Sequence, residues 1–253
     1  MKYAAAILLF MVGLAGAKEI DPVLLLTELT AANKAKDAGK IGTLLKGVSE
    51  VGKTSKDQKI VDALAKELGS SFKVCKGNWG TLRGIADTLG ELRSKNSVSK
   101  LKKYAYQKKA KDDNHASIQV RALLAIGKMA DSRQIDSLGD QCKNRKLPIA
   151  KAAYEAFKHY GTAKGKTRKR CAEVLMKRLE AEKPSSGGQQ GGGTVSQEAQ
   201  ERWQQLANVI IASMQAVCHD PTINDVDNWR EWWKENKKNA KVWKDKKPEP
   251  AGS

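Results

Sequence analysis

Apolar residues recur at three- and four-residue spacing through the first two thirds of the chain, from residue 19 to residue 182. That spacing is the period of an amphipathic α-helix, whereas a strand would alternate. Three apolar stripes lie at Leu24–Leu29, Ile41–Val48 and Ile60–Leu68, with Gly, Lys and Ser between them. The pattern therefore predicts an all-α fold that begins with three helices.

The chain then repeats itself. The segment Ile85–Leu101 matches Ala122–Leu138 at an offset of 37 residues. A third copy begins with a first helix around Ile149, at an offset of 31, and its second helix, Cys171–Leu179, lies at an offset of 36. We assign the difference to an insertion in the turn between these two helices, Gly161–Arg170.

Each repeat is predicted to be a helix, a short turn and a second helix. A helix pair of this size cannot bury both faces alone, so neighbouring pairs must stack into a solenoid. Small residues in the first helices permit close approach of adjacent repeats. These residues are Ala122, Ala125, Ala153 and Ala156.

The segment SIQVRALLAIGKMADSRQIDSL resembles a HEAT repeat of the short, bacterial type. It shows the order apolar-x-x-x-Ala-x-x-Ala-apolar-Gly, then Asp131 at the turn and a second helix. The resemblance covers roughly residues 80–179. It departs from the family where an Arg often follows the first apolar residue, because Leu82, Gln119 and Ala150 stand there. The resemblance implies an α-solenoid that serves as a binding scaffold more often than as an enzyme.

The C-terminal third has a different composition. Residues 184–194 begin with PSSGGQQGGG, which is typical of a flexible linker. It divides a HEAT-like domain over residues 18–183 from a tryptophan-rich helical hairpin over residues 195–247. In the hairpin, one apolar helical stripe runs from Trp203 to Val217, and Asp220-Pro221 ends that helix.

The second hairpin helix carries three tryptophans within five residues. Trp229, Trp232 and Trp233 share one helical face, which continues toward Trp243. Either this face docks on the Trp203–Val217 stripe or on the open end of the solenoid, or it forms an exposed platform on which sugar rings stack. We favour docking, because the helical spacing and the reach of the linker both permit it.

The N-terminus has the three-part layout of a secretory signal peptide over residues 1–17. Lys2 precedes an apolar run from Ala4 to Leu14, and the small residues Ala15-Gly16-Ala17 follow. The apolar run is shorter than the ~20 residues that a membrane span needs. We therefore expect cleavage near Ala17 and export, either to a periplasm or outside the cell.

The net charge of +18 predicts anionic partners. For an exported chain, acidic proteins, acidic glycans and lipid headgroups come before nucleic acid. One basic group follows the second helices and would form a stripe along one edge: Lys109, Lys111, Lys143, Arg145 and Lys146. Another lies in the enlarged turn on the opposite edge: Lys164, Lys166, Arg168, Lys169 and Arg170. The alternative for each group is ordinary solvation of an exposed face.

The sequence offers little for catalysis. It has no phosphate loop, no HExxH and no nucleophile elbow. Cys218-His219-Asp220 are adjacent, and adjacent helical positions do not face one another. The four cysteines either form two disulfides, in any of three pairings, or are small buried hydrophobes, and they lack the spacing of a zinc site. They are Cys75, Cys142, Cys171 and Cys218.

Together these patterns predict a non-catalytic exported scaffold without cofactor or metal, which presents a basic surface to a protein or to an anionic envelope component. The alternative is a nucleic-acid-binding or DNA-processing HEAT-like protein. The oligomeric state and the identity of the partner stay open.

Overall fold

A computed structural model of the chain describes residues 20–184 and 196–245. In these ranges the chain forms eleven α-helices and three 3-10 helices and contains no β-strand. The α-helices are α1 (Pro22–Ala35), α2 (Ala38–Thr54), α3 (Gln58–Val74), α4 (Trp79–Leu92), α5 (Val98–Ala105), α6 (Asp113–Met129), α7 (Ile135–Gln141), α8 (Leu147–Lys158), α9 (Gly165–Glu182), α10 (Gln197–Cys218) and α11 (Val226–Asn236). The 3-10 helices are η1 (Lys95–Ser97), η2 (Ser132–Gln134) and η3 (His159–Thr162).

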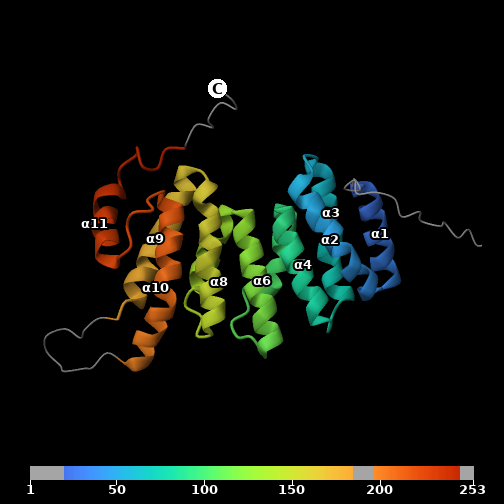
Figure 1. The fold of residues 1–253 in the computed structure, drawn as a ribbon, viewed down its shortest axis with the longest axis horizontal. Coiled ribbons are helices and arrows are strands. Elements are labelled where there is room, and N and C mark those ends of the chain that lie inside the picture. The colour runs from blue at the N-terminus through green and yellow to red at the C-terminus, as the bar shows by residue number, and fades with distance from the viewer. Residues whose placement is uncertain (1–19, 185–195, 246–253) are drawn as a thin grey trace, which may run out of the picture.

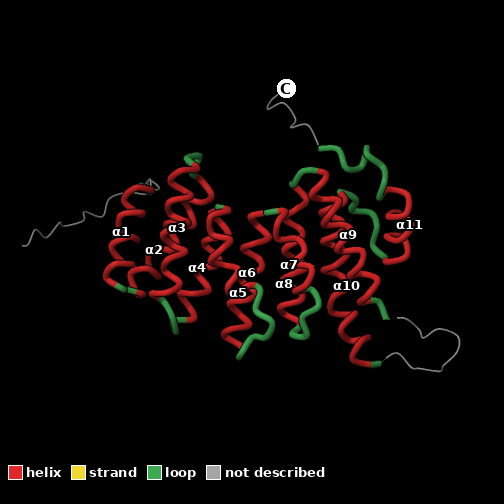
Figure 2. The backbone as a smooth tube through the Cα atoms, turned by 180° about the vertical axis from the view of Figure 1, so that it is seen from behind, coloured by secondary structure: helices red, strands yellow, loops and turns green. Residues whose placement is uncertain are grey.

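The helices stack into an elongated two-layer array (Figure 1). One layer is a continuous row in which α2, α4, α6, α8 and α10 each contact the next. The second layer holds α1, α3, α5, α7 and α9, which pair with helices of the first row, and α11 packs on α9 at the end of the array (Figure 2). The prediction of an all-α helical-repeat fold is confirmed, and the three predicted repeats are the pairs α4–α5, α6–α7 and α8–α9.

Side-chain caps start most of these helices. In seven of the described α-helices an Asp, Asn or Ser side chain accepts hydrogen bonds from the first backbone N–H groups, which otherwise have no partner. The caps are Asp21, Asp37, Asp57, Asn78, Asp112, Ser196 and Asp225. These short polar residues therefore mark where the chain turns from a connection into a helix.

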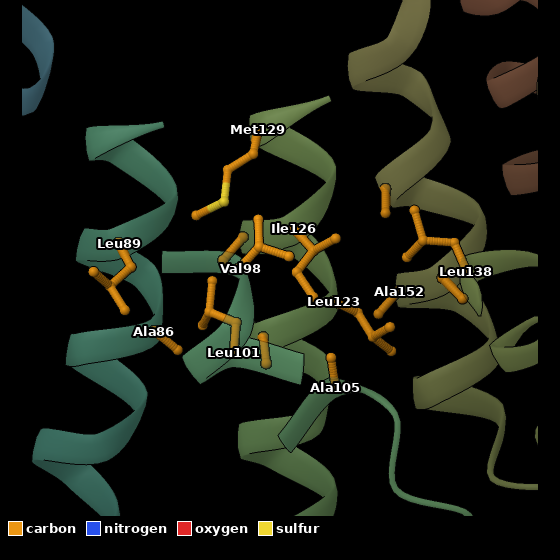
Figure 3. Close-up of a cluster of buried hydrophobic side chains, with 14 of the residues drawn as sticks. Ala86, Leu89, Val98, Leu101, Ala105, Leu123, Ile126, Met129, Leu138 and Ala152 are labelled. Atoms are coloured by element: carbon orange, nitrogen blue, oxygen red, sulfur yellow. The ribbon is translucent and has the colours of Figure 1, made fainter. Parts of the chain in front are cut away.

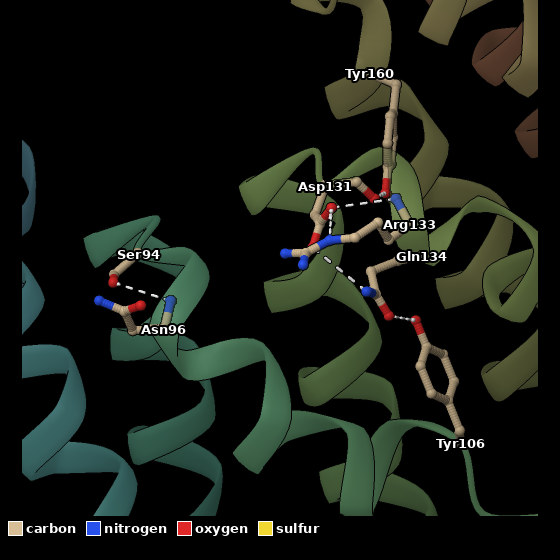
Figure 4. A network of polar contacts seen from close by, with 7 residues as sticks. All are labelled: Ser94, Asn96, Tyr106, Asp131, Arg133, Gln134 and Tyr160. Atoms are coloured by element: carbon tan, nitrogen blue, oxygen red, sulfur yellow. Dashed lines mark hydrogen bonds and ion pairs between the residues drawn. The ribbon is translucent and has the colours of Figure 1, made fainter.

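The turns inside the first two of these repeats share one design. Ser94 caps η1 and Asp131 caps η2, and the two residues are equivalent at the 37-residue offset. The Asp131 carboxylate also accepts from the Arg133 guanidinium, and the Tyr160 hydroxyl donates to the Asp131 carbonyl at 2.9 Å (Figure 4). The Tyr160 bond ties this turn to the next repeat.

Two glycine–alanine contacts set the spacing along the first row. A Cβ on Gly90 would lie 3.0 Å from the Ala125 Cα, and a Cβ on Gly127 would lie 2.6 Å from the Ala156 Cα. These distances leave no room for a side chain on either glycine. Ala125 and Ala156 thus lie where neighbouring helices approach closely, as predicted. A glycine of the preceding first-row helix forms the other side of each contact.

The core lies between the two layers. Leu89 of α4, Leu101 of α5, Ile126 of α6 and Leu138 of α7 are all fully buried and lie along one continuous seam (Figure 3). Each unit contributes apolar residues to its own seam and to that of its neighbour, as stacking requires.

The four cysteines are free and buried. Of the two alternatives raised by the sequence, the structure has small buried hydrophobes rather than disulfides. Burial raises the pKa of the thiols of Cys142, Cys171 and Cys218.

The C-terminal helices extend the array. Helix α10 packs against α8 and α9, and α11 packs against α9. The Ser213 hydroxyl of α10 is buried and donates to the Tyr154 carbonyl of α8 at 2.8 Å. The predicted signal peptide, residues 185–194 of the predicted linker and residues 246–247 of the predicted hairpin lie outside the described residues. Within the described ranges, every helix is too short or too polar to cross a membrane.

Candidate functional site

A basic groove of about 670 Å³ lies where the α5–α6 connection meets the α7–α8 connection. Both connections follow a second-layer helix, so they leave the array at the same edge. The charged residues that line the groove are Lys108, Lys109, Asp140, Lys143, Arg145 and Lys146. Four of the five residues predicted to form a basic stripe therefore meet in one groove. The fifth residue, Lys111, is exposed but does not line the groove.

Gln119 of α6 holds the two connections together. Its side chain is fully buried. The amide nitrogen donates to the carbonyls of Ala105 and Gln107 at 3.1 and 2.9 Å, and to the Gln141 side-chain oxygen at 3.0 Å. The sequence marked Gln119 only as a departure from the HEAT pattern. Its role could not be read there, because the three acceptors come from both walls of the groove.

The positive charges of the groove are only partly neutralised. Lys143 pairs with Asp140 at 3.0 Å, and the Lys146 ammonium lies 3.9 Å from an Asp113 carboxylate oxygen. Among the residues that the structure describes, Lys109 and Arg145 have no carboxylate within 4.0 Å. All these side chains are exposed, so such pairs contribute little to stability and remain free to exchange for an external anion.

Helix α10 is anchored to the same loop through Arg202. Its guanidinium forms a two-bond ion pair with Glu182, at 2.8 and 3.0 Å, and donates to the carbonyls of Cys142 and Asn144 at 3.3 and 3.1 Å. The hydrogen bond with Glu182 raises the pKa of Arg202. Nothing in the sequence pattern distinguishes Arg202, which is one charge among 46 Lys and Arg residues.

The second basic group does not form an exposed turn. After η3, helix α9 already begins at Gly165, so Lys166, Lys169 and Arg170 are helical and only Lys164 precedes the helix. Arg170 pairs with Asp136 at 2.8 Å and with Glu173 at 3.3 Å. The length that the repeat comparison assigned to an enlarged turn is mostly an elongated first part of α9.

Arg168 of that group lies in the interior, with 2% of its surface exposed. The guanidinium donates to the carbonyls of Val217 and Lys244, at 3.2 and 3.1 Å, and lies 5.8 Å from the centre of the Trp243 ring. Burial lowers its pKa. Arg168 therefore joins α9 to the end of α10 and to the segment after α11, and it does not face an external anion.

The tryptophans form a cluster with one buried member. Trp229 is fully buried, while Trp232, Trp233 and Trp243 are half-buried. Their rings meet edge to face, with centroid separations of 5.4 to 6.2 Å. Trp203 on α10 is also half-buried against the core. A face whose first indole is buried and whose others contact one another is not a flat exposed platform.

Trp243 reaches the cluster by a route that helical periodicity does not describe. Helix α11 ends at Asn236, the chain reverses, and the Trp243 indole nitrogen donates back to the Asn236 carbonyl at 2.9 Å. The sequence analysis placed Trp243 on a continuation of the helical face. The residue does belong to the cluster, but it is not on the helix.

The groove offers charge attraction and hydrogen-bond donors. The described ranges contain no group of three or more His, Cys, Asp or Glu side chains that could hold a metal ion. Their cysteines are buried with raised pKa, which makes a thiol a poor nucleophile. Comparison with known proteins finds no protein-family model that matches the chain and no similar sequence among curated proteins.

Proposed function

We propose that the protein is an exported, non-catalytic scaffold of the HEAT type that holds an anionic partner in the basic groove. One observation carries the proposal: Lys109, Lys143, Arg145 and Lys146 come from two different connections and converge on one groove. Clefts lined by one sign of charge concentrate the opposite charge and favour its association.

The repeats support the HEAT part of this proposal. The 37-residue offset relates the capped turns at Ser94 and Asp131, and it also relates Gly90 to Gly127. The layout of residues 1–17 supports export. On that basis the partner is an acidic glycan, a lipid headgroup or an acidic protein surface.

The test is charge reversal in the chain that begins at Lys18. Lys143, Arg145 and Lys146 are changed together to Glu, and Lys34, Lys46 and Lys59, which are exposed on other helices, are changed together as the control. Both variants lose the same net charge. Binding to an acidic polysaccharide, to anionic vesicles and to duplex DNA is measured as salt is raised, because exposed charges are screened over about 8–10 Å at physiological ionic strength.

The groove variant should bind its preferred probe about 3- to 150-fold more weakly than the control variant, as expected for three exposed ion pairs of about 0.2–1 kcal/mol each. Equal loss in the two variants would reduce the groove to general basicity and would contradict the proposal. A preference for DNA over both envelope probes would favour the nucleic-acid-binding alternative instead.

A further inference from the structure

A second basic pocket, of about 350 Å³, lies between α3 and α5 and shares no lining residue with the basic groove. We call it the α3–α5 pocket. Lys73 and Lys76 come from the end of α3 and the turn after it, and Lys100 and Lys103 come from α5. Its volume falls within the range of about 300–1,000 Å³ that small-molecule sites occupy.

The wall of the α3–α5 pocket between the lysines is aromatic. Phe72 and Tyr104 line it, and their ring centroids lie 4.8 Å apart with an angle of 32° between the planes. Phe72 is mostly buried and Tyr104 is half-buried. The pair therefore offers a fixed apolar surface next to the charges.

Gly69 makes room for one of the lysines. A Cβ at this position would lie 3.0 Å from the Lys100 Cγ. The methylene stem of Lys100 thus lies across α3, where any larger residue would displace it. The aliphatic part of a lysine can cover apolar surface in this way while its charge stays accessible.

The ammonium groups of the pocket have no charge partner. In residues 20–184 and 196–245, none of Lys73, Lys76, Lys100 and Lys103 lies within 4.0 Å of a carboxylate, whereas Lys143 in the basic groove is paired. Four like charges around one cavity repel one another, so an anion placed among them would relieve that repulsion.

Tyr104 adds a free hydrogen-bonding group. The hydroxyls of Tyr106, Tyr154 and Tyr160 each donate to a protein acceptor. Over the same described ranges, the Tyr104 hydroxyl is the exception, with no protein partner. Burial raises the pKa of Tyr104, so this hydroxyl keeps its proton at neutral pH and can donate it.

We propose that the α3–α5 pocket binds a phosphate monoester that carries a flat ring. The lysines would hold the phosphate, since the compact ammonium of lysine commonly binds phosphate groups. The ring would lie against Tyr104 and Phe72. A bare inorganic anion would use the charges and leave the aromatic wall empty. The pocket therefore favours phosphate and ring together.

The test is titration calorimetry at constant ionic strength, with phenyl phosphate, inorganic phosphate and phenol as probes. Phenyl phosphate should bind about tenfold more tightly than inorganic phosphate, a difference of about 1.4 kcal/mol, and phenol should not bind measurably. Adenosine monophosphate carries a flat ring and should bind more tightly than glucose 1-phosphate, whose sugar ring is a puckered chair. The opposite preference would contradict the part of the proposal that concerns the flat ring.

Two variants divide the roles within the pocket. Lys100→Met with Lys103→Met should weaken phenyl phosphate about tenfold or more, while Lys34→Met with Lys46→Met, which removes the same charge elsewhere, should leave it within about twofold. Tyr104→Leu should abolish the advantage of phenyl phosphate over inorganic phosphate and spare binding of the latter. Circular dichroism and thermal melting of each variant verify that it is folded.

Equal affinity for phenyl phosphate and inorganic phosphate in the unsubstituted protein would overturn the proposal, and so would equal loss in the pocket variant and its control. Neither result depends on the basic groove, because reversal of Lys143, Arg145 and Lys146 should leave phenyl phosphate binding unchanged.

Discussion

At the scale of single residues, Gly127 and Ala156 decide how closely α6 and α8 approach. Gly127 stands in the last turn of α6, and glycine within a helix costs up to about 1 kcal/mol relative to alanine. Its value lies in the missing side chain, because the Ala156 backbone occupies the place where a Cβ would be. A close approach between neighbouring repeats thus outweighs helix propensity at this position.

Gly127→Ala is therefore expected to destabilise the protein by about 1–3 kcal/mol through overpacking, despite the better helix propensity of alanine. Chemical denaturation measures the loss. Gly80→Ala is the matched control, since its Cβ would meet its nearest atom at 3.7 Å, and this variant should be equally stable or slightly more so. An equally stable Gly127→Ala variant would mean that the two helices are farther apart.

His159 at the end of α8 introduces a pH dependence. Burial lowers its pKa, and the positive charges of Lys128 and Arg93 lower it further. The folded protein therefore disfavours the charged ring, whereas the unfolded chain takes up the proton near pH 6.5. The contribution to stability is complete above that pH and is lost as the pH falls toward the lower pKa of the folded state.

We expect the free energy of unfolding to fall between about pH 6.5 and the lower pKa of folded His159, and His159→Gln should flatten the profile in this window. Denaturation at a series of pH values measures the slope. An unchanged slope in His159→Gln would assign the effect to other groups.

Residue by residue, the sequence identifies charges and indoles better than it assigns their environment. Arg168 and Lys169 are neighbours in one basic run, yet Arg168 is buried and Lys169 is not. The carbonyls that accept from Arg168 belong to Val217 and Lys244, which are 49 and 76 positions away. A local sequence pattern carries no information about contacts between residues so far apart in the chain.

At the scale of elements, the burial of one indole, that of Trp229, holds α11 against the rest of the protein. Trp229 is fully buried, and its indole nitrogen has no hydrogen-bond partner among the described residues. Apolar contact rather than a polar bond therefore holds the ring. Trp232 and Trp233 are only half-buried.

Trp229→Ala should cost about 3–5 kcal/mol, as for other large core deletions, and should shift tryptophan emission to the red as the cluster becomes wetter. Trp229→Phe keeps most of the apolar volume and should cost less than about 1.5 kcal/mol. Trp233→Ala should fall between them. A larger effect at Trp233 than at Trp229 would contradict the packing of α11 described above.

The helical period predicts the existence of α10 and α11 and the residues that each turns toward the protein. It does not predict the surface that receives them, because an apolar stripe fits many partners. The anchor is supplied by Arg202, which bonds to Glu182 and to the loop at Asn144. The sequence accordingly favoured docking of the tryptophan face but left open the surface on which it docks.

At the scale of the whole molecule, the two ends of the array differ. At the first end, Val23 and Leu24 of α1 are 63% and 55% exposed. At the other end, Leu206, Ile210, Met214 and Val217 of α10 are buried. A chain that ends at Pro184 would leave the α8 and α9 surfaces that α10 covers in contact with water.

Such a truncated chain should melt at a lower temperature than the full chain and should bind an apolar dye that the full chain does not bind. Differential scanning fluorimetry and dye titration measure the two effects. Equal melting temperatures would show that α10 adds no stability to the repeats, contrary to its buried stripe.

The repeat offset predicts the arrangement of the middle of the molecule because each unit contacts its own copy one step along. The same logic fails at the C-terminal end, where α10 occupies the next place in the row without belonging to a recognisable fourth repeat. The basic groove was predicted only in part. Its lysines were predicted to share an edge. The hydrogen bonds of Gln119 that join the two walls were not predicted, because their acceptors lie on other segments of the chain.

The place of α10 in the row also implies an order of folding. Ser213 meets Tyr154 across 59 positions, and closing this larger loop rather than one of 37 residues costs only about 0.4 kcal/mol more. Chain entropy alone would therefore hardly delay it. The surface that receives α10 is made jointly by α8 and α9, and it does not exist until those two helices have packed. Helix α10 should consequently assemble late and detach early, as a reversible terminus on an array whose inner repeats are already complete.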